Sequence, residues 1–240
     1  MRKLIYLDNS ATSFPKPPQV FEAVDSFMRY SGGSAGRAAH KKAREAMETA
    51  TLCRSLAAQL IGAENPEEII FIKNATEGLN IILRSMVKSG DKVVVSPLEH
   101  NAVMRPLTAS GAEISVLPVN ERGETQVEML DGNIDSASLV VLNHVSNVSG
   151  AICDIYRAAE LCREADVPLV VDCSQSAGHI PIDVSSLGAS VVFPGHKGLL
   201  GPQGTGVMYL HGISPEALCY GGTGTDSESF IQPLTLPDYY

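Results

Sequence analysis

Short apolar runs rich in valine and isoleucine recur along the chain without the polar alternation of a half-exposed strand. Strands that are apolar on both faces are typical of a largely parallel sheet covered on both sides. The pattern therefore predicts strands at six places: residues 69–72, 93–95, 139–142, 169–171, 191–193 and 207–210.

Stretches with helical spacing lie before and between these runs. One covers about residues 18–30, with Phe21, Val24 and Met28 on one face, and another runs from 41 to 61, where Gly62 stops it. Others span roughly 76–87, 101–110 and 155–165. Strands that alternate with helices predict an α/β fold in three layers, with a mostly parallel sheet and helices on both faces.

The composition is that of an ordinary globular protein. The 240 residues are 44% hydrophobic and 19% charged, so a core can form without a disulfide or metal. Lys and Arg number 18 against 27 Asp and Glu, and the net charge of −9 disfavours nucleic acid and anionic membranes as partners. The five cysteines include no CxxC pair and no metal-ligand spacing. No apolar run approaches the roughly 18 residues of a membrane span. We expect a cytoplasmic protein without a metal.

Polar clusters follow five of the predicted strands. They are Asn74-Ala75-Thr76, Glu99-His100-Asn101, residues 143–147, residues 172–175 and Gly195-His196-Lys197. In sheets of this kind, ligands bind at the carboxyl ends of the strands. The clusters are therefore the candidates for a functional site.

Two of these clusters carry groups suited to covalent chemistry on a carbonyl. Lys197 lies in a glycine-rich, uncharged turn, where a desolvated amine with a lowered pKa can form a Schiff base. The alternative is a surface lysine in a flexible loop. Asp172 ends a buried strand, and a carboxylate there needs a positive partner, such as the protonated ring nitrogen of pyridoxal phosphate (PLP). The alternative is an aspartate that caps the next turn.

The remaining clusters offer weaker signals. Ala75 and Thr76 stand at a strand-to-helix junction, where free N–H groups bind phosphate, although Asn74 could simply cap the helix. His100 could stack on a flat ring or be structural. Gln175 could bond the phenolic oxygen of PLP or face solvent.

Taken together, these motifs resemble the class V aminotransferase family of fold-type I PLP enzymes, most closely its cysteine desulfurase and selenocysteine lyase branch. The matching segments are residues 6–12, Asn74-Ala75-Thr76-Glu77-Gly78, Glu99-His100-Asn101, residues 144–150, residues 171–175, and Gly195-His196-Lys197 followed by residues 201–206. Six ordered motifs over almost the whole chain make the resemblance specific.

The resemblance implies a role for each matching residue. Lys197 would form the Schiff base and move protons, with His100 stacking on the ring and assisting. Asp172 would pair with the ring nitrogen and Gln175 with the phenolic oxygen. Residues at the phosphate would be Ala75, Thr76 and His196. Residues at the substrate would be Ala11, Thr12 and Asn147, of which Asn147 would also reach the cofactor.

One position departs from the family pattern. Many members have serine two residues before the histidine of the lysine motif, whereas this chain has Pro194. The resemblance implies a homodimer in which Thr223 reaches the phosphate of the neighbouring subunit and compensates.

The resemblance also implies a division of the chain. Residues 1–15 would form an N-terminal arm, 16–211 the PLP-binding large domain, and 212–240 a Gly-, Ser- and Pro-rich segment leading towards a small C-terminal domain. We expect that domain to be missing, together with its substrate-binding arginine and sulfur-carrying cysteine. Among the cysteines present, we expect Cys53, Cys153, Cys162 and Cys173 to be buried, and Cys219 is the one to test.

The implied function is that of a cysteine desulfurase, which converts L-cysteine to L-alanine and enzyme-bound sulfur and passes the sulfur to an acceptor protein. Alternatives within the family are a selenocysteine lyase and an aminotransferase. A catalytically inactive, truncated PLP-binding remnant is the alternative outside the enzymes. A nicotinamide-binding module finds no support, because no GxGxxG motif follows the first strand.

Overall fold

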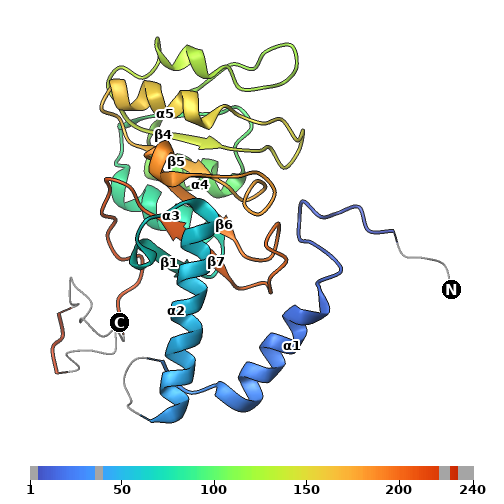
Figure 1. Cartoon of the computed structure of the whole chain (residues 1–240). Coiled ribbons are helices and arrows are strands. Elements are labelled where there is room, and N and C mark those ends of the chain that lie inside the picture. Colours follow the sequence, from blue (N-terminus) through green and yellow to red (C-terminus); the bar gives the residue numbers. More distant parts are fainter. Residues whose placement is uncertain (1–4, 36–39, 222–227, 232–240) are drawn as a thin grey trace.

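The computed structural model describes residues 5–35, 40–221 and 228–231. Within these ranges, the chain forms a seven-stranded sheet with helices on both faces, as predicted (Figure 1). The strand order is β1-β7-β6-β5-β4-β2-β3. None of the described helices has the length and apolar character needed to cross a membrane.

The strands are short and lie close to their predicted positions. They are β1 (Ile69–Ile72), β2 (Lys92–Val95), β3 (Glu113–Val116), β4 (Ala137–Asn143), β5 (Leu169–Asp172), β6 (Ser190–Pro194) and β7 (Gly206–Tyr209). All neighbours pair in parallel except β7, which is antiparallel to both β6 and β1. The chain turns back after β6 without a crossover helix, and this reverses β7. Strand β3 was not predicted, because it is a half-exposed edge strand in which polar residues interrupt the apolar pattern.

The helices form the two outer layers. They are α1 (Pro18–Ser26), the π-helical η1 (Phe27–Ser31), α2 (Lys41–Ile61), the 3₁₀ turn η2 (Pro66–Glu68), α3 (Ala75–Met86), α4 (Asn101–Ser110), the 3₁₀ turn η3 (Val127–Leu130), α5 (Ile155–Glu164) and α6 (Val184–Leu187). Helices α3 and α4 cover one face of the sheet, whereas α5, α6 and the end of α2 cover the other.

The central strand β4 shows how the sequence fixes this arrangement. Leu139 and Val141 pack with α3 and α4, and Val140 and Leu142 pack with α5 and α6. All four side chains are fully buried, because successive side chains of a strand point to opposite faces. Burying each of them stabilises the fold by about 1.5–3 kcal/mol.

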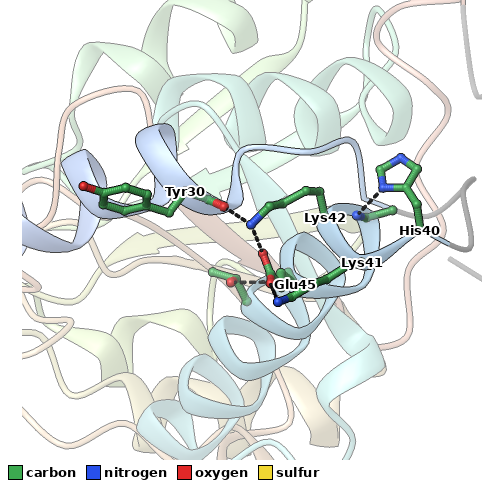
Figure 2. Close-up of polar contacts among 7 residues, drawn as sticks. Tyr30, His40, Lys41, Lys42 and Glu45 are labelled. Carbon is green, nitrogen blue, oxygen red and sulfur yellow. Dashed lines mark hydrogen bonds and ion pairs between the residues drawn. The ribbon is translucent and has the colours of Figure 1, made fainter.

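Helix α1 lies outside this core, beside α2 (Figure 1). It contains no buried residue, and Phe21 and Met28 of its predicted apolar face are exposed. Polar contacts tie the segment after it to the start of α2 (Figure 2): Lys42 donates to the carbonyl oxygen of Tyr30 and contacts Glu45 Oε2 at 2.8 Å. The Nδ1 atom of His40 caps α2 by accepting from the N–H of Ala43 at 3.2 Å. The segment that follows α1 is therefore anchored to the start of α2.

Candidate functional site

A polar pocket lies where the parallel strands end. Strands β1, β2, β4, β5 and β6 all direct their carboxyl ends to this edge, because β7 is the one antiparallel strand among those described. The loops that follow these strands supply the lining: Asn74, Ala75, Thr76, His100, Ala102, Asn143, Val145, Asn147, Asp172, Ser174, Gln175, Pro194, His196 and Lys197. The strand-end clusters selected from the sequence therefore meet around one pocket.

Asp172 and Lys197 bring opposite charges to this pocket. Asp172 is only 4% exposed, and its Oδ1 accepts a hydrogen bond from the N–H of Ser174 at 2.9 Å. Burial lowers the pKa of the Lys197 amine, and the negative charge of Asp172 partly offsets this effect. Lys197 therefore combines a weakened hold on its proton with a nearby carboxylate, as a carbonyl-binding amine requires.

The start of helix α3 gives the pocket an anion-binding corner. Asn74 caps the helix, since its Oδ1 accepts from the N–H of Glu77 at 2.9 Å. The N–H groups of Ala75 and Thr76 belong to the first turn, which has no acceptor within the helix. These groups and the helix dipole favour a phosphate. The N-terminus of α3 can therefore be capped by Asn74 and bind an anion at the same time.

His100 has a structural contact and also faces the pocket. Its Nδ1 accepts from the N–H of Ala102 at 3.1 Å and so caps α4. Because Nδ1 is an acceptor in this contact, the ring proton is assigned to Nε2. The cap fixes the ring at the mouth of the pocket, so the structural and functional interpretations of this histidine are compatible.

The N-terminal arm is bound to the lysine loop. Thr12 Oγ1 lies 2.9 Å from His196 Nδ1, and Ser13 Oγ lies 2.8 Å from the carbonyl oxygen of Lys197. Lys16 Nζ donates to the carbonyl oxygen of His196 at 2.5 Å. Burial, with the charges of Lys197 and Lys16, lowers the pKa of His196. Residues that precede the first strand thus hold the lysine loop from outside the pocket lining.

Close backbone packing holds the lysine loop in place. A Cβ atom at Gly198 would overlap the carbonyl oxygen of Ala177, in the turn after β5. One at Gly201 would lie 2.8 Å from the carbonyl oxygen of Gly195. The glycines around Lys197 therefore permit close contact, and the interpretation of a flexible surface loop does not fit.

The structure gathers most of the predicted site residues. Those that line the pocket are Ala75, Thr76, His100, Asn147, Asp172, Gln175, His196 and Lys197. Thr12 joins them through His196, and Gln175 Nε2 donates to the carbonyl oxygen of Ser10 at 2.8 Å. Ala11 is exposed and does not line the pocket, and Thr223 lies outside the described residues.

Sequence reasoning missed Ser13 and Lys16, which bind the lysine loop. It placed Glu99 and Asn143 in the strand-end clusters but assigned no role to either, although the two are hydrogen-bonded to each other. The position of Ser13 directly after the motif at residues 6–12 is the signal that could have drawn attention to the arm. The prediction for Cys53 was wrong: it is exposed, because the face of α2 that carries it borders an open groove beside Phe71, whereas Cys153, Cys162 and Cys173 are buried and Cys219 is exposed.

Comparison with known proteins agrees with this arrangement. The family model for aminotransferase class-V matches residues 5–238. The chain belongs to the aminotransferase class-V family. A probable cysteine desulfurase of Pyrococcus abyssi is 34% identical over 98% of this chain and 61% of its own length. A cysteine desulfurase of Escherichia coli O7:K1 is 36% identical over 86% of this chain and 53% of its own length.

A solved structure gives the same fold. The apo structure of a cysteine desulfurase from Thermococcus onnurineus NA1 superimposes with a TM-score of 0.80 at 34% identity, covering 87% of this chain and 54% of that protein. The present chain thus spans between half and two thirds of the length of these class-V relatives.

The class-V family uses PLP, and the pocket has the donors and acceptors that PLP requires. A helix N-terminus suits its phosphate, a buried carboxylate suits its protonated ring nitrogen, and a lysine amine suits its aldehyde. Thr76, Asp172 and Lys197 provide these groups around one cavity. The residues present therefore fit the cofactor.

Proposed function

We propose that this chain binds PLP and forms the cofactor-binding part of a cysteine desulfurase. The observation that carries the proposal is the presence of Lys197, Asp172 and the α3 N-terminus around one pocket. The names of the relatives support L-cysteine as the substrate. Because the chain spans only part of these relatives, the activity of the whole protein is part of the proposal.

Each pocket residue has a proposed task. The N–H groups of Ala75 and Thr76, the Thr76 hydroxyl and His196 would hold the phosphate. Asp172 would keep the ring nitrogen protonated, and Gln175 would contact the phenolic oxygen. When bound, PLP supplies an electron sink for the negative charge that develops on the substrate.

The remaining groups would act on the substrate. The Lys197 amine, with its lowered pKa, would hold the PLP aldehyde covalently until the substrate amine displaces it, and the freed Nζ would then move a proton to and from the substrate carbons. His100 would stack against the ring, while Ala11, Thr12 and Asn147 would border the substrate.

The overall reaction balances with one thiol as the sulfur acceptor. The Cβ–S bond of L-cysteine breaks, the sulfur forms an S–S bond to the acceptor thiolate, and a proton replaces sulfur on Cβ. The products are L-alanine and a persulfide on the acceptor. An acceptor protein that takes this sulfur onward, a homodimer with Thr223 at the neighbouring phosphate, and a cytoplasmic location complete the proposal.

The first test is covalent binding of PLP. The protein is mixed with PLP, reduced with borohydride and digested, and mass spectrometry locates the pyridoxyl group. We expect it on Lys197 and expect it to be lost in Lys197→Ala, while Lys88→Ala retains it because Lys88 lies outside the pocket. Wild-type protein without a pyridoxyl group at Lys197 would refute the proposal.

The second test identifies the reaction. The PLP-loaded protein is incubated with L-cysteine and dithiothreitol, and alanine and sulfide are measured. Equal amounts of the two support a desulfurase. Activity confined to L-selenocysteine indicates a selenocysteine lyase, a product that keeps its thiol indicates an aminotransferase, and PLP binding without turnover indicates an inactive remnant. Each of these three outcomes would replace the desulfurase assignment.

A further inference from the structure

A buried carboxyl group beneath the pocket has no task in the proposed reaction. It belongs to Glu99, in the loop between β2 and α4, directly before His100. Its Oε2 atom is buried and has no hydrogen-bond partner among the described residues. A buried polar atom of this kind calls for an explanation.

The other carboxyl oxygen ties two strand ends together. Oε1 accepts from the Ser96 hydroxyl at 2.6 Å and from the N–H of Asn143 at 2.6 Å. The Asn143 side chain adds a further hydrogen bond between the same two segments, in which its Nδ2 donates to the carbonyl oxygen of Leu98 at 2.6 Å. Glu99 therefore joins the loop that carries His100 to the end of β4.

The same network reaches the strand that carries Asp172. Asn143 and Asp172 are register partners on β4 and β5, and both line the pocket. The carboxyl group of Glu99 thus fixes the spacing between the histidine loop and the strand end beside Asp172.

The surroundings of this carboxyl group are acidic or neutral. The titratable groups that interact with it electrostatically are Asp172 on β5 and the Cys153 thiol in the segment before α5. Both of its hydrogen-bond donors are uncharged, and no described cation forms an ion pair with it. A buried carboxylate in such surroundings is unfavourable, so it takes up a proton. Burial, reinforced by the charge of Asp172, raises the pKa of Glu99 to about 8.

We infer that Glu99 is a positioning residue of the cofactor site, which acts as an uncharged carboxylic acid and holds the His100 loop on the end of β4, beside Asp172. The inference rests on the proposed function, since it assigns the purpose of this network to PLP binding. Cys153 does not share the role, because its thiol has a pKa raised to about 12.

The first test measures protonation without PLP. Unfolding of the wild type and of Glu99→Gln is followed from pH 5 to pH 8. We expect the wild-type unfolding constant, relative to that of Glu99→Gln, to rise about tenfold per pH unit, since unfolding releases the extra proton. Histidines such as His144, whose pKa burial lowers, act in the opposite direction and cancel in this comparison.

Two variants control this measurement. Glu113→Gln removes an exposed carboxyl group, and Cys153→Ala removes a neighbouring thiol. In both variants, the unfolding constant should depend on pH as it does in the wild type. If Glu99→Gln also keeps this pH dependence, Glu99 is charged in the folded protein and the inference is wrong.

The second test measures PLP affinity at pH 7. Glu99→Gln should bind PLP about as tightly as the wild type, because an amide oxygen accepts the same two hydrogen bonds. Glu99→Ala should bind about tenfold more weakly, because the N–H of Asn143 loses its acceptor. If Glu99→Ala does not fold, the PLP affinity of Glu99→Gln still tests the inference. An affinity equal to that of the wild type supports a neutral hydrogen-bond acceptor at position 99, and an affinity about tenfold weaker overturns the inference.

The two proposals fail in different ways. A wild type that binds no PLP refutes the proposed function and, with it, the positioning role. A wild type that binds PLP, combined with a Glu99→Gln variant as impaired as Glu99→Ala, refutes the positioning role alone.

Discussion

The imidazole Nδ1 of His196 lies 2.9 Å from the Thr12 hydroxyl, although 184 positions separate the two residues in the chain. Neighbouring residues extend the contact, because Ser13 and Lys16 bind the carbonyl oxygens of Lys197 and His196. The N-terminal arm therefore fixes the orientation of the proposed phosphate-binding histidine. The parallel strands alone would leave that ring without this partner.

Replacement of Thr12 by valine should weaken PLP binding about fivefold, because His196 loses the Thr12 hydroxyl both at Nδ1 and at its carbonyl oxygen. The free energy of unfolding should change little, since the contact is only partly buried. Titration with PLP, followed by absorbance, measures the affinity. Thr108→Val is the matched control, because Thr108 bonds only within α4. Equal affinities of Thr12→Val and the wild type would contradict the proposed role of the arm.

The tight packing of the lysine loop gives a second prediction. Gly198→Ala should lower the free energy of unfolding by about 1–3 kcal/mol, because its Cβ would overlap the carbonyl oxygen of Ala177. Urea denaturation measures the change. Gly132→Ala should be close to neutral, since nothing lies within 4 Å of its added Cβ. Similar stabilities of the two variants would show that the loop relaxes freely.

The third prediction concerns the amine of Lys197. Because burial lowers its pKa, Lys197 should be acylated at lower pH than exposed Lys88 in protein without PLP. Asp172→Asn should move the Lys197 profile to still lower pH, because the carboxylate that favours the charged amine is gone. Mass spectrometry of partially acetylated protein measures both profiles. A shift to higher pH in Asp172→Asn would contradict this electrostatic pairing.

The cysteines should fall into two classes of reactivity. Cys53 and Cys219 are exposed and should react with an aromatic disulfide reagent in the folded protein, although partial burial raises the pKa of the Cys53 thiol and slows its reaction. Cys153 and Cys162 should react only after unfolding, because they are buried and burial raises the pKa of each thiol to about 12. Cys173 is also buried and should behave in the same way. Absorbance of the released thiolate, with and without urea, counts each class, and fast reaction of Cys162 would contradict the structure.

Much of the fold follows from local patterns. The helices at 41–61 and 101–110 were predictable from their helical spacing, and the six strands from their unbroken apolar runs, because burial imposes both patterns. Strand β3 escaped detection because an exposed edge strand need not be apolar. The exposure of Phe21 and Met28 was also unpredictable, since a periodic face indicates a helix but does not identify what covers it.

The same distinction between local patterns and contacts of distant segments applies to the candidate site. Residues with distinctive chemistry at strand ends, such as Asp172 and Lys197, could be selected from the sequence, because parallel strands bring their carboxyl ends together. Ser13 and Lys16 could not be selected, and Glu99 could be placed in a cluster but given no role. Their importance lies in hydrogen bonds to segments far away in the chain, which no local pattern encodes.

The α/β alternation, the strand ends that carry chemistry and the class-V motifs can be identified in the amino-acid sequence, because each depends on residues close together in the chain. The antiparallel direction of β7, the contact of the N-terminal arm with His196, and the burial of the Glu99 carboxyl group among uncharged donors near Asp172 arise only in the folded protein. These outcomes depend on burial and on distances between remote segments. Those quantities exist only once the layers of the fold have packed.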